Sequence, residues 1–157
     1  RVATEVRKVL ITSFGYKDQN RELYEAVIAA GYLHDCVEDG HITFDDLRAE
    51  LNGLTNAKFV DIIIRIIDRV TRRKGENYFQ FIRRIGAITH TSDYEVENLA
   101  RIYAILVKIC DINDNLGPTD SGSRSDKYRF AAHMLCTQST TMNLGYTVPA
   151  NIINQLK

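Results

Sequence analysis

The stretch YEVENLARIYAILVKICDINDN, Tyr94 to Asn115, is the longest helical segment of the chain and decides its fold class. Its apolar residues follow the spacing of a helix and cover most of the helix circumference. A helix of this kind has to be surrounded by other elements, so we expect it at the centre of the domain. Asp111 and Asn115 close the segment four residues apart, which places them on one face.

The rest of the chain also has helical periodicity, and no alternating pattern typical of a strand occurs. Thr43 with Asp46, and Ser92 with Glu95, match the capping-box pattern that opens a helix. Further helices are expected at residues 2–13, 21–37, 43–51, 58–73, 76–85 and 127–138, with a last short one from Thr147. We therefore predict an all-α protein of seven or eight helices, with one domain over residues 1–157.

Composition narrows the classes of protein that the chain can belong to. It has 157 residues, 45% of them hydrophobic and 25% charged, and its formal net charge is zero. General attraction to a nucleic acid polymer or an anionic membrane is therefore not expected. Cys36, Cys110 and Cys136 form no C-x-x-C pair, which favours reduced thiols in a cytoplasmic protein over a disulfide. The apolar segment IYAILVKIC contains Lys108 and is much shorter than the ~20 residues of a membrane span.

A cluster of ionisable residues follows an apolar run in GYLHDCVEDG, residues 31–40. If the helix continues through it, His34 lies beside Glu38 and Asp35 beside Asp39, so that the four head groups converge on one edge. Burying these groups is costly unless they are paired or bind a metal.

Two interpretations of this cluster remain open from spacing alone. His34 and Asp35 offer nitrogen and oxygen ligands that suit Mn²⁺, Fe²⁺ or Zn²⁺ and suit Ca²⁺ poorly, and Asp111 on the central helix could complete such a site. Asn115 would face the same cavity. The alternative is a helix end at Gly40 decorated with solvated acids.

Four segments, taken together and in this order, resemble the RelA/SpoT-type HD hydrolases, in particular their small stand-alone members. They are AAGYLHDCVEDGHITFDDLRAE (29–50), IDRVTRRKGENYFQFIRRI (67–85), VKICDINDNLGPT (107–119) and DKYRFA (126–131). The corresponding family patterns are A-A-x-L-H-D-x-V-E-D-T-x-x-T-x-x-D-L, V-T-R-R-x-G-E-x-Y-x-x-F-I-x-R-I, V-K-L-A-D-L-x-x-N-L-x-P-T and K-Y-R-x-A. The resemblance implies the helical bundle of an HD domain.

The resemblance also implies a role for each matching residue of the metal site. His34 and Asp35 match the central metal-binding pair, and Asp111 matches the distal metal-binding aspartate. Glu38 and Asp39 match the acidic pair that orients or deprotonates the attacking water. The metal would be divalent, with Mn²⁺ the first expectation and Fe²⁺ or Zn²⁺ the alternatives.

Substrate-binding residues are implied in the same way. Asn115 matches an asparagine that contacts the nucleotide ribose, and Tyr128 matches a tyrosine on the substrate side. Arg124, one helical turn before Tyr128, would suit a phosphate. Lys108 matches the lysine before the metal-binding aspartate, with a structural ion pair as an equally acceptable interpretation. The basic residues of 69–74, with Arg83 and Arg84, are either further phosphate ligands or solvated helix ends.

The chain departs from the family pattern at several positions. The first metal-binding histidine of the family belongs to a pattern H-P-x-R-V-A, and here R-V-A is Arg1 to Ala3. That histidine would precede residue 1, so we expect an incomplete N-terminus, the alternative being a lost ligand. Cys110 stands where the family has alanine, and Ile112 where it often has arginine.

The implied activity is metal-dependent hydrolysis of a nucleotide, in particular removal of the 3′-pyrophosphate from the alarmones (p)ppGpp by a stand-alone enzyme. Two alternatives stay open. The site could act on another nucleotide, because HD sites share their metal chemistry across substrates, or the domain could bind a nucleotide or a protein without turnover. A homo-oligomer is compatible with either.

Overall fold

A computed structural model describes residues 1–14, 20–88, 93–116 and 122–140 of the chain. These residues form seven α-helices and no strand, which confirms the predicted all-α class. The helices are α1 (Val2–Ser13), α2 (Arg21–Leu33), α3 (Phe44–Asn52), α4 (Ala57–Val70), α5 (Tyr78–Ile85), α6 (Tyr94–Asn115) and α7 (Ser123–Thr140). The helix expected from Thr147 lies outside the described residues.

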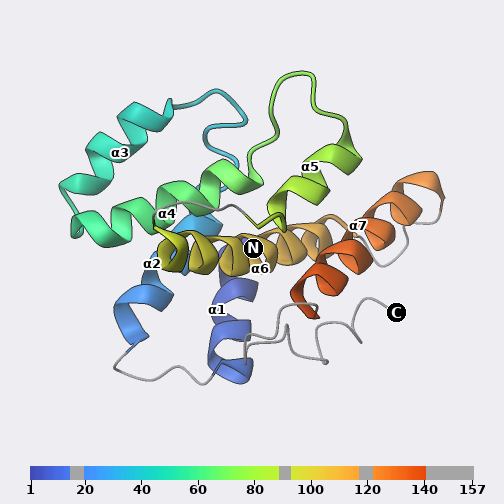
Figure 1. Ribbon diagram of the computed structural model, residues 1–157, viewed down its shortest axis with the longest axis horizontal. Coiled ribbons are helices and arrows are strands. Elements are labelled where there is room, and N and C mark those ends of the chain that lie inside the picture. Colours follow the sequence, from blue (N-terminus) through green and yellow to red (C-terminus); the bar gives the residue numbers. More distant parts are fainter. Residues whose placement is uncertain (15–19, 89–92, 117–121, 141–157) are drawn as a thin grey trace.

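Helix α6 is the central element of the fold, as its composition predicted. It contacts α1, α2, α4, α5 and α7, and Figure 1 shows it across the middle of the molecule, with α4 and α5 to one side and α1 to the other. Its buried residues are Ala100, Arg101, Tyr103, Ala104, Ile105, Leu106, Val107, Ile109, Cys110, Asp111 and Ile112. Because nearly every position of its middle turns is buried, the packing on all sides fixes its orientation.

Capping explains several helix boundaries. The capping box predicted at Thr43 is present: its hydroxyl accepts a hydrogen bond from the Asp46 N–H at 3.2 Å, and the Asp46 carboxylate accepts one from the Thr43 N–H at 3.4 Å. Helix α6 begins at Tyr94 as predicted, although its N-cap residue, Asp93, makes no side-chain capping bond. Ser92, the other predicted cap, lies outside the described residues.

The helix predicted at 21–37 is too long, because α2 ends at Leu33. The residues after it form turns that close with the two hydrogen bonds of a Schellman motif, which reach back to the carbonyls of Cys36 and Val37 at 3.1 Å each. Gly40 has a φ of 74°, the left-handed conformation that this motif requires and that glycine adopts without strain. The ionisable cluster therefore lies on the turns that follow α2, one of which is closed by a hydrogen bond from the Asp39 N–H to the Asp35 carbonyl at 2.9 Å.

Two smaller boundary predictions also differ from the structure. Helix α4, predicted at 58–73, ends at Val70, and α7 is longer than the predicted 127–138. All three cysteines carry free thiols, as expected. Among the described residues, no helix combines the length and the apolar character needed to cross a membrane.

The ends of α4 and α5 are capped reciprocally by one arginine from each helix. Arg69 of α4 donates hydrogen bonds to the carbonyls of Ile85 at 2.9 Å and Ala87 at 3.1 Å, at the end of α5. Arg84 of α5 donates to the carbonyl of Arg69 at 3.2 Å and to that of Thr71 at 2.8 Å, at the end of α4. Each guanidinium thus satisfies carbonyls that have no partner within their own helix.

Carboxylates neutralise these two arginines. Arg84 binds Glu76 through two hydrogen bonds, of 2.8 Å and 3.0 Å. Arg69 is 6% exposed and pairs with Glu97 of α6, which also binds Arg65 at 2.6 Å. Arg69 and Arg84, two of the basic residues considered as phosphate ligands, are therefore engaged in joining helices.

Replacing Arg84 tests this reciprocal capping. Arg84→Met leaves Glu76 and the last carbonyls of α4 without their partner, so we expect it to lower the free energy of unfolding by roughly 2–4 kcal/mol. Arg83→Met is the matched control, because Arg83 is exposed. Urea denaturation followed by circular dichroism measures both, and equal stabilities of the two variants would contradict the capping role.

Candidate metal centre between α2 and α6

Asp111 is a buried carboxylate, 8% exposed, in the last turn of the central helix. Lys108, one turn earlier, lies with its Nζ 2.6 Å from Asp111 Oδ2. Asn115, one turn later, donates a hydrogen bond from Nδ2 to Asp111 Oδ1 at 2.8 Å. Helical spacing alone therefore places a cation, a carboxylate and an amide side by side on one face of α6.

His34 meets this carboxylate from the end of α2. Its Nε2 lies 3.0 Å from Asp35 Oδ2 and 3.6 Å from Asp111 Oδ1. Neither approach is a hydrogen bond, and this buried nitrogen has no hydrogen-bond partner among the described residues.

The other ring nitrogen of His34 is held by the backbone. Nδ1 lies 2.9 Å from the carbonyl oxygen of Gly31, and because a carbonyl can only accept, Nδ1 carries the proton. In the neutral imidazole the lone pair is then on Nε2, directed at the two carboxylates. Metal-binding histidines are oriented in this way, with the second nitrogen donating to a carbonyl or carboxylate.

Gly31 also brings α1 close to this region. A Cβ at Gly31 would lie 3.2 Å from Ala3 Cα, which is closer than most side chains allow. A pocket of about 320 Å³ opens here, lined by His34, the Asp111 face of α6 and the start of α1. Arg1 lies at its rim with Nε 2.6 Å from Asp114 Oδ1. The first residues of the chain therefore border the candidate centre.

The three groups around His34 Nε2 shift each other's pKa. Burial alone would lower the pKa of His34, but the neighbouring carboxylates of Asp111 and Asp35 outweigh it and raise that pKa above its ordinary value. Burial works in the opposite direction on Asp111, and His34 and Lys108 overcome it, so the pKa of Asp111 is lowered. Burial raises the pKa of Asp35 although His34 opposes it.

Glu38 and Asp39, the predicted water-handling pair, are exposed and do not belong to the lining of the pocket at His34. Glu38 Oε2 accepts a hydrogen bond from the backbone N–H of Arg72 at 3.0 Å. Asp39 Oδ2 lies 3.9 Å from Nε2 of His41. The convergence of four head groups expected from a continuous helix is therefore reduced to His34 and Asp35, joined by Asp111.

The predicted substrate-binding residues lie on α6 and α7. Lys108 and Asn115 contact Asp111, so Lys108 forms the ion pair that was one of its two interpretations. Tyr128 packs at the contact of α5 and α7, with its ring centroid 6.3 Å from that of Tyr78. Arg124 belongs to α7, and its side chain lies outside the described part of the structure.

Sequence reasoning missed several residues at this centre. Gly31 gave no signal of its own, because its role depends on the close approach of α1 and α2, and Arg1 was noted only as the start of the R-V-A match. Asp114 could have been noticed, since it follows Asp111 by one helical turn.

A divalent metal fits the donor set of His34, Asp35 and Asp111. The supporting observation is the buried Nε2, which lacks a hydrogen bond and faces two carboxylates. In the described ranges, however, no three His, Cys, Asp or Glu side chains already stand in the arrangement of metal ligands. Both oxygens of Asp111 are engaged, one with Lys108 and one with Asn115, so metal binding requires these contacts to adjust.

The raised pKa of His34 predicts how the stability of metal-free protein depends on pH. Protonated His34 is favoured in the folded state, so its contribution is fully present below its ordinary pKa of 6.5 and is lost as pH rises through the raised pKa. We expect the stability difference between wild type and His34→Gln to be largest below pH 6.5 and to shrink as the pH rises above that value. Thermal unfolding with chelator present measures it, with His133→Gln, at an exposed position, as control. A difference independent of pH would contradict the assignment.

No protein-family model, curated protein or solved structure matches the chain. The function is therefore inferred from the geometry of this centre and from the motifs that resemble the HD hydrolases.

Proposed function

We propose that the chain is a metal-dependent nucleotide phosphohydrolase of the HD type, whose substrate is guanosine 3′,5′-bis(diphosphate), cleaved at its 3′-pyrophosphate. The observation that carries the proposal is His34, whose ring is fixed by Gly31 and whose buried Nε2 faces Asp35 and Asp111 without a hydrogen bond. The order of the four motif segments supports the substrate class.

His34, Asp35 and Asp111 would hold the metal. When bound, a divalent metal supplies Lewis acidity toward a phosphoryl oxygen and the attacking water. Asn115 keeps the Asp111 carboxylate oriented through its hydrogen bond of 2.8 Å. Lys108 adds positive charge beside the carboxylates, which an anionic substrate needs at this point.

The proton of the attacking water goes to Glu38 or Asp39 in this proposal. Glu38 is the better candidate, because the Arg72 N–H holds its carboxylate in place, whereas Asp39 lies 3.9 Å from the exposed His41. A positioned general base of this kind contributes roughly 10²–10⁴-fold to the rate. Both residues are exposed, so water reaches them without a conformational change.

Removing metal ligands tests the proposal. Manganese-loaded wild type is expected to release pyrophosphate from guanosine 3′,5′-bis(diphosphate), and His34→Ala and Asp111→Asn are expected to lose both the metal and the activity. His133→Ala, at an exposed position, should retain both. Metal content by mass spectrometry and pyrophosphate release are the measurements, with circular dichroism confirming the fold. Full activity of His34→Ala would refute the metal site, and activity on another nucleotide alone would refute the substrate.

A pair of isosteric variants separates the two acids. In Glu38→Gln the amide oxygen still accepts the Arg72 N–H, so the turn should stay in place while the base is lost. We expect kcat to fall by roughly 10²–10⁴-fold in Glu38→Gln and by less than about tenfold in Asp39→Asn. Steady-state kinetics with equal metal loading measures both, and the reverse order would assign the base to Asp39.

Binding of a nucleotide without turnover is the second candidate function. The contacts that Asp111 already makes within the protein favour it. Lys108 and Asn115 already satisfy both carboxylate oxygens, which is a stable arrangement for a buried acid. The two functions differ in metal uptake. Protein that binds the nucleotide while taking up no manganese, iron or zinc would be a binding module.

A further inference from the structure

Tyr78, the first residue of α5, has a hydroxyl that the proposed mechanism does not use. This hydroxyl oxygen is buried and has no hydrogen-bond partner in the described part of the chain. Buried hydroxyls normally have partners, because an unmade hydrogen bond costs free energy. The hydroxyl is therefore a donor without an acceptor among the described residues.

The ring of Tyr78 is fixed by its neighbours. Phe81 and Tyr128 pack edge-on against it, with ring centroids 6.2 Å and 6.3 Å away. The ammonium group of Lys127 lies 3.9 Å from the Tyr78 ring centroid. These contacts hold the hydroxyl in one position, so it does not have to be ordered when a ligand binds.

Phe81 connects Tyr78 to the candidate metal centre. Phe81 also contacts Lys108, whose Nζ lies 5.0 Å from the Phe81 ring centroid and 2.6 Å from Asp111 Oδ2. Burial, Tyr128 and Asp111 together raise the pKa of the Tyr78 hydroxyl, so this group stays protonated and neutral near pH 7. A neutral donor can approach an anion close to Asp111 without adding a negative charge.

We propose that Tyr78 is a substrate-binding residue whose hydroxyl donates a hydrogen bond to a phosphate oxygen of the nucleotide. Lys127, over the Tyr78 ring, and Lys108, over the neighbouring Phe81 ring, supply positive charge near this subsite. Phosphate oxygens only accept hydrogen bonds, so a hydroxyl donor with ammonium groups nearby matches their chemistry. The proposal rests on the proposed function, because it takes the nucleotide as the ligand.

The variant Tyr78→Phe removes only the hydroxyl. We expect KM for guanosine 3′,5′-bis(diphosphate) to rise by roughly tenfold, the usual effect of losing a hydrogen bond to a charged group, while kcat changes by less than about threefold. The melting temperature should stay equal or rise, because the lost hydroxyl has no partner among the residues that the structure describes. A lower melting temperature with unchanged KM would mean a structural role and overturn the proposal.

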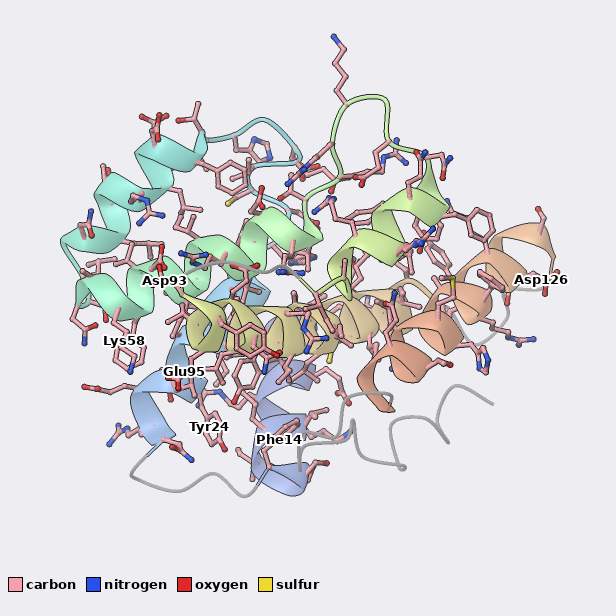
Figure 2. The ribbon with its side chains drawn as sticks, in the orientation of Figure 1. Phe14, Tyr24, Lys58, Asp93, Glu95 and Asp126 are labelled. Atoms are coloured by element: carbon pink, nitrogen blue, oxygen red, sulfur yellow. The ribbon has the colours of Figure 1, made fainter. Side chains whose placement is uncertain are left out.

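Tyr24→Phe is the matched control. The hydroxyl of Tyr24 donates to the Phe14 carbonyl at 3.4 Å, and Figure 2 shows both residues where α1 and α2 face each other, on other helices than Tyr78. This variant should leave KM unchanged. A KM that rises equally in both variants would also overturn the proposal.

A binding measurement separates this proposal from the proposed function. Inorganic pyrophosphate is titrated calorimetrically into manganese-loaded full chain, and its Kd is expected to rise by roughly tenfold in Tyr78→Phe and to stay unchanged in Tyr24→Phe. If wild type hydrolyses no nucleotide, the proposed function fails. The pyrophosphate Kd values of wild type and Tyr78→Phe still test whether Tyr78 binds phosphate. Equal Kd values for wild type and Tyr78→Phe, or no binding to wild type, would refute the subsite.

Discussion

The burial of α6 on all sides is the constraint from which the candidate centre follows. Because the helix is enclosed up to its last turn, Asp111 is carried into the interior, where it is 8% exposed. A buried carboxylate needs compensation. Lys108 and Asn115 provide it from the same helix, and His34 approaches from α2. The packing that makes the helix central thus also assembles a cation, an imidazole and two carboxylates in one place.

The reciprocal arginine caps also help to hold Glu38, the proposed water-handling residue, in position. Arg84 holds the segment between α4 and α5 at both ends, through the carbonyl of Thr71 and the carboxylate of Glu76. The N–H of Arg72, at the start of that segment, bonds to Glu38. A guanidinium far from Glu38 in the sequence therefore helps to fix the position of this carboxylate. The same contacts explain why these arginines do not serve as phosphate ligands.

The fold was predictable from the sequence wherever periodicity and cap residues set the boundaries, and less so where a helix ends in turns. The bounds of α6 and the capping box at Thr43 followed from periodicity and cap residues. The end of α2 did not, because turns begin where His34 turns its ring back to Gly31 and bonds to the carbonyl there. A periodic pattern contains no information about that contact.

The candidate site shows the same division. His34 and Asp111 could be predicted to meet because each follows an apolar helix and each belongs to a recognisable motif. Tyr78 matches the tyrosine of the second motif segment but was given no role, since an aromatic residue at helical spacing is usually part of the core. Only the three-dimensional structure distinguishes its unpartnered hydroxyl from a packed ring.

The segments that resemble the HD hydrolases play two different physical roles in this chain. GYLHDCVEDG and VKICDINDNL contribute ionisable groups to one buried centre, whereas TRRKGENYFQFIRRI contributes none of its proposed metal ligands. In the latter segment Glu76 and Arg84 bind each other, and Phe81 packs between Tyr78 and Lys108. The segments with the proposed metal ligands and the segment with the structural contacts meet separate requirements. A chance match to one kind of segment would therefore not produce a match to the other kind. Their joint occurrence, with Phe81 linking them in space, is a stronger argument for the proposed activity than the His-Asp pair alone.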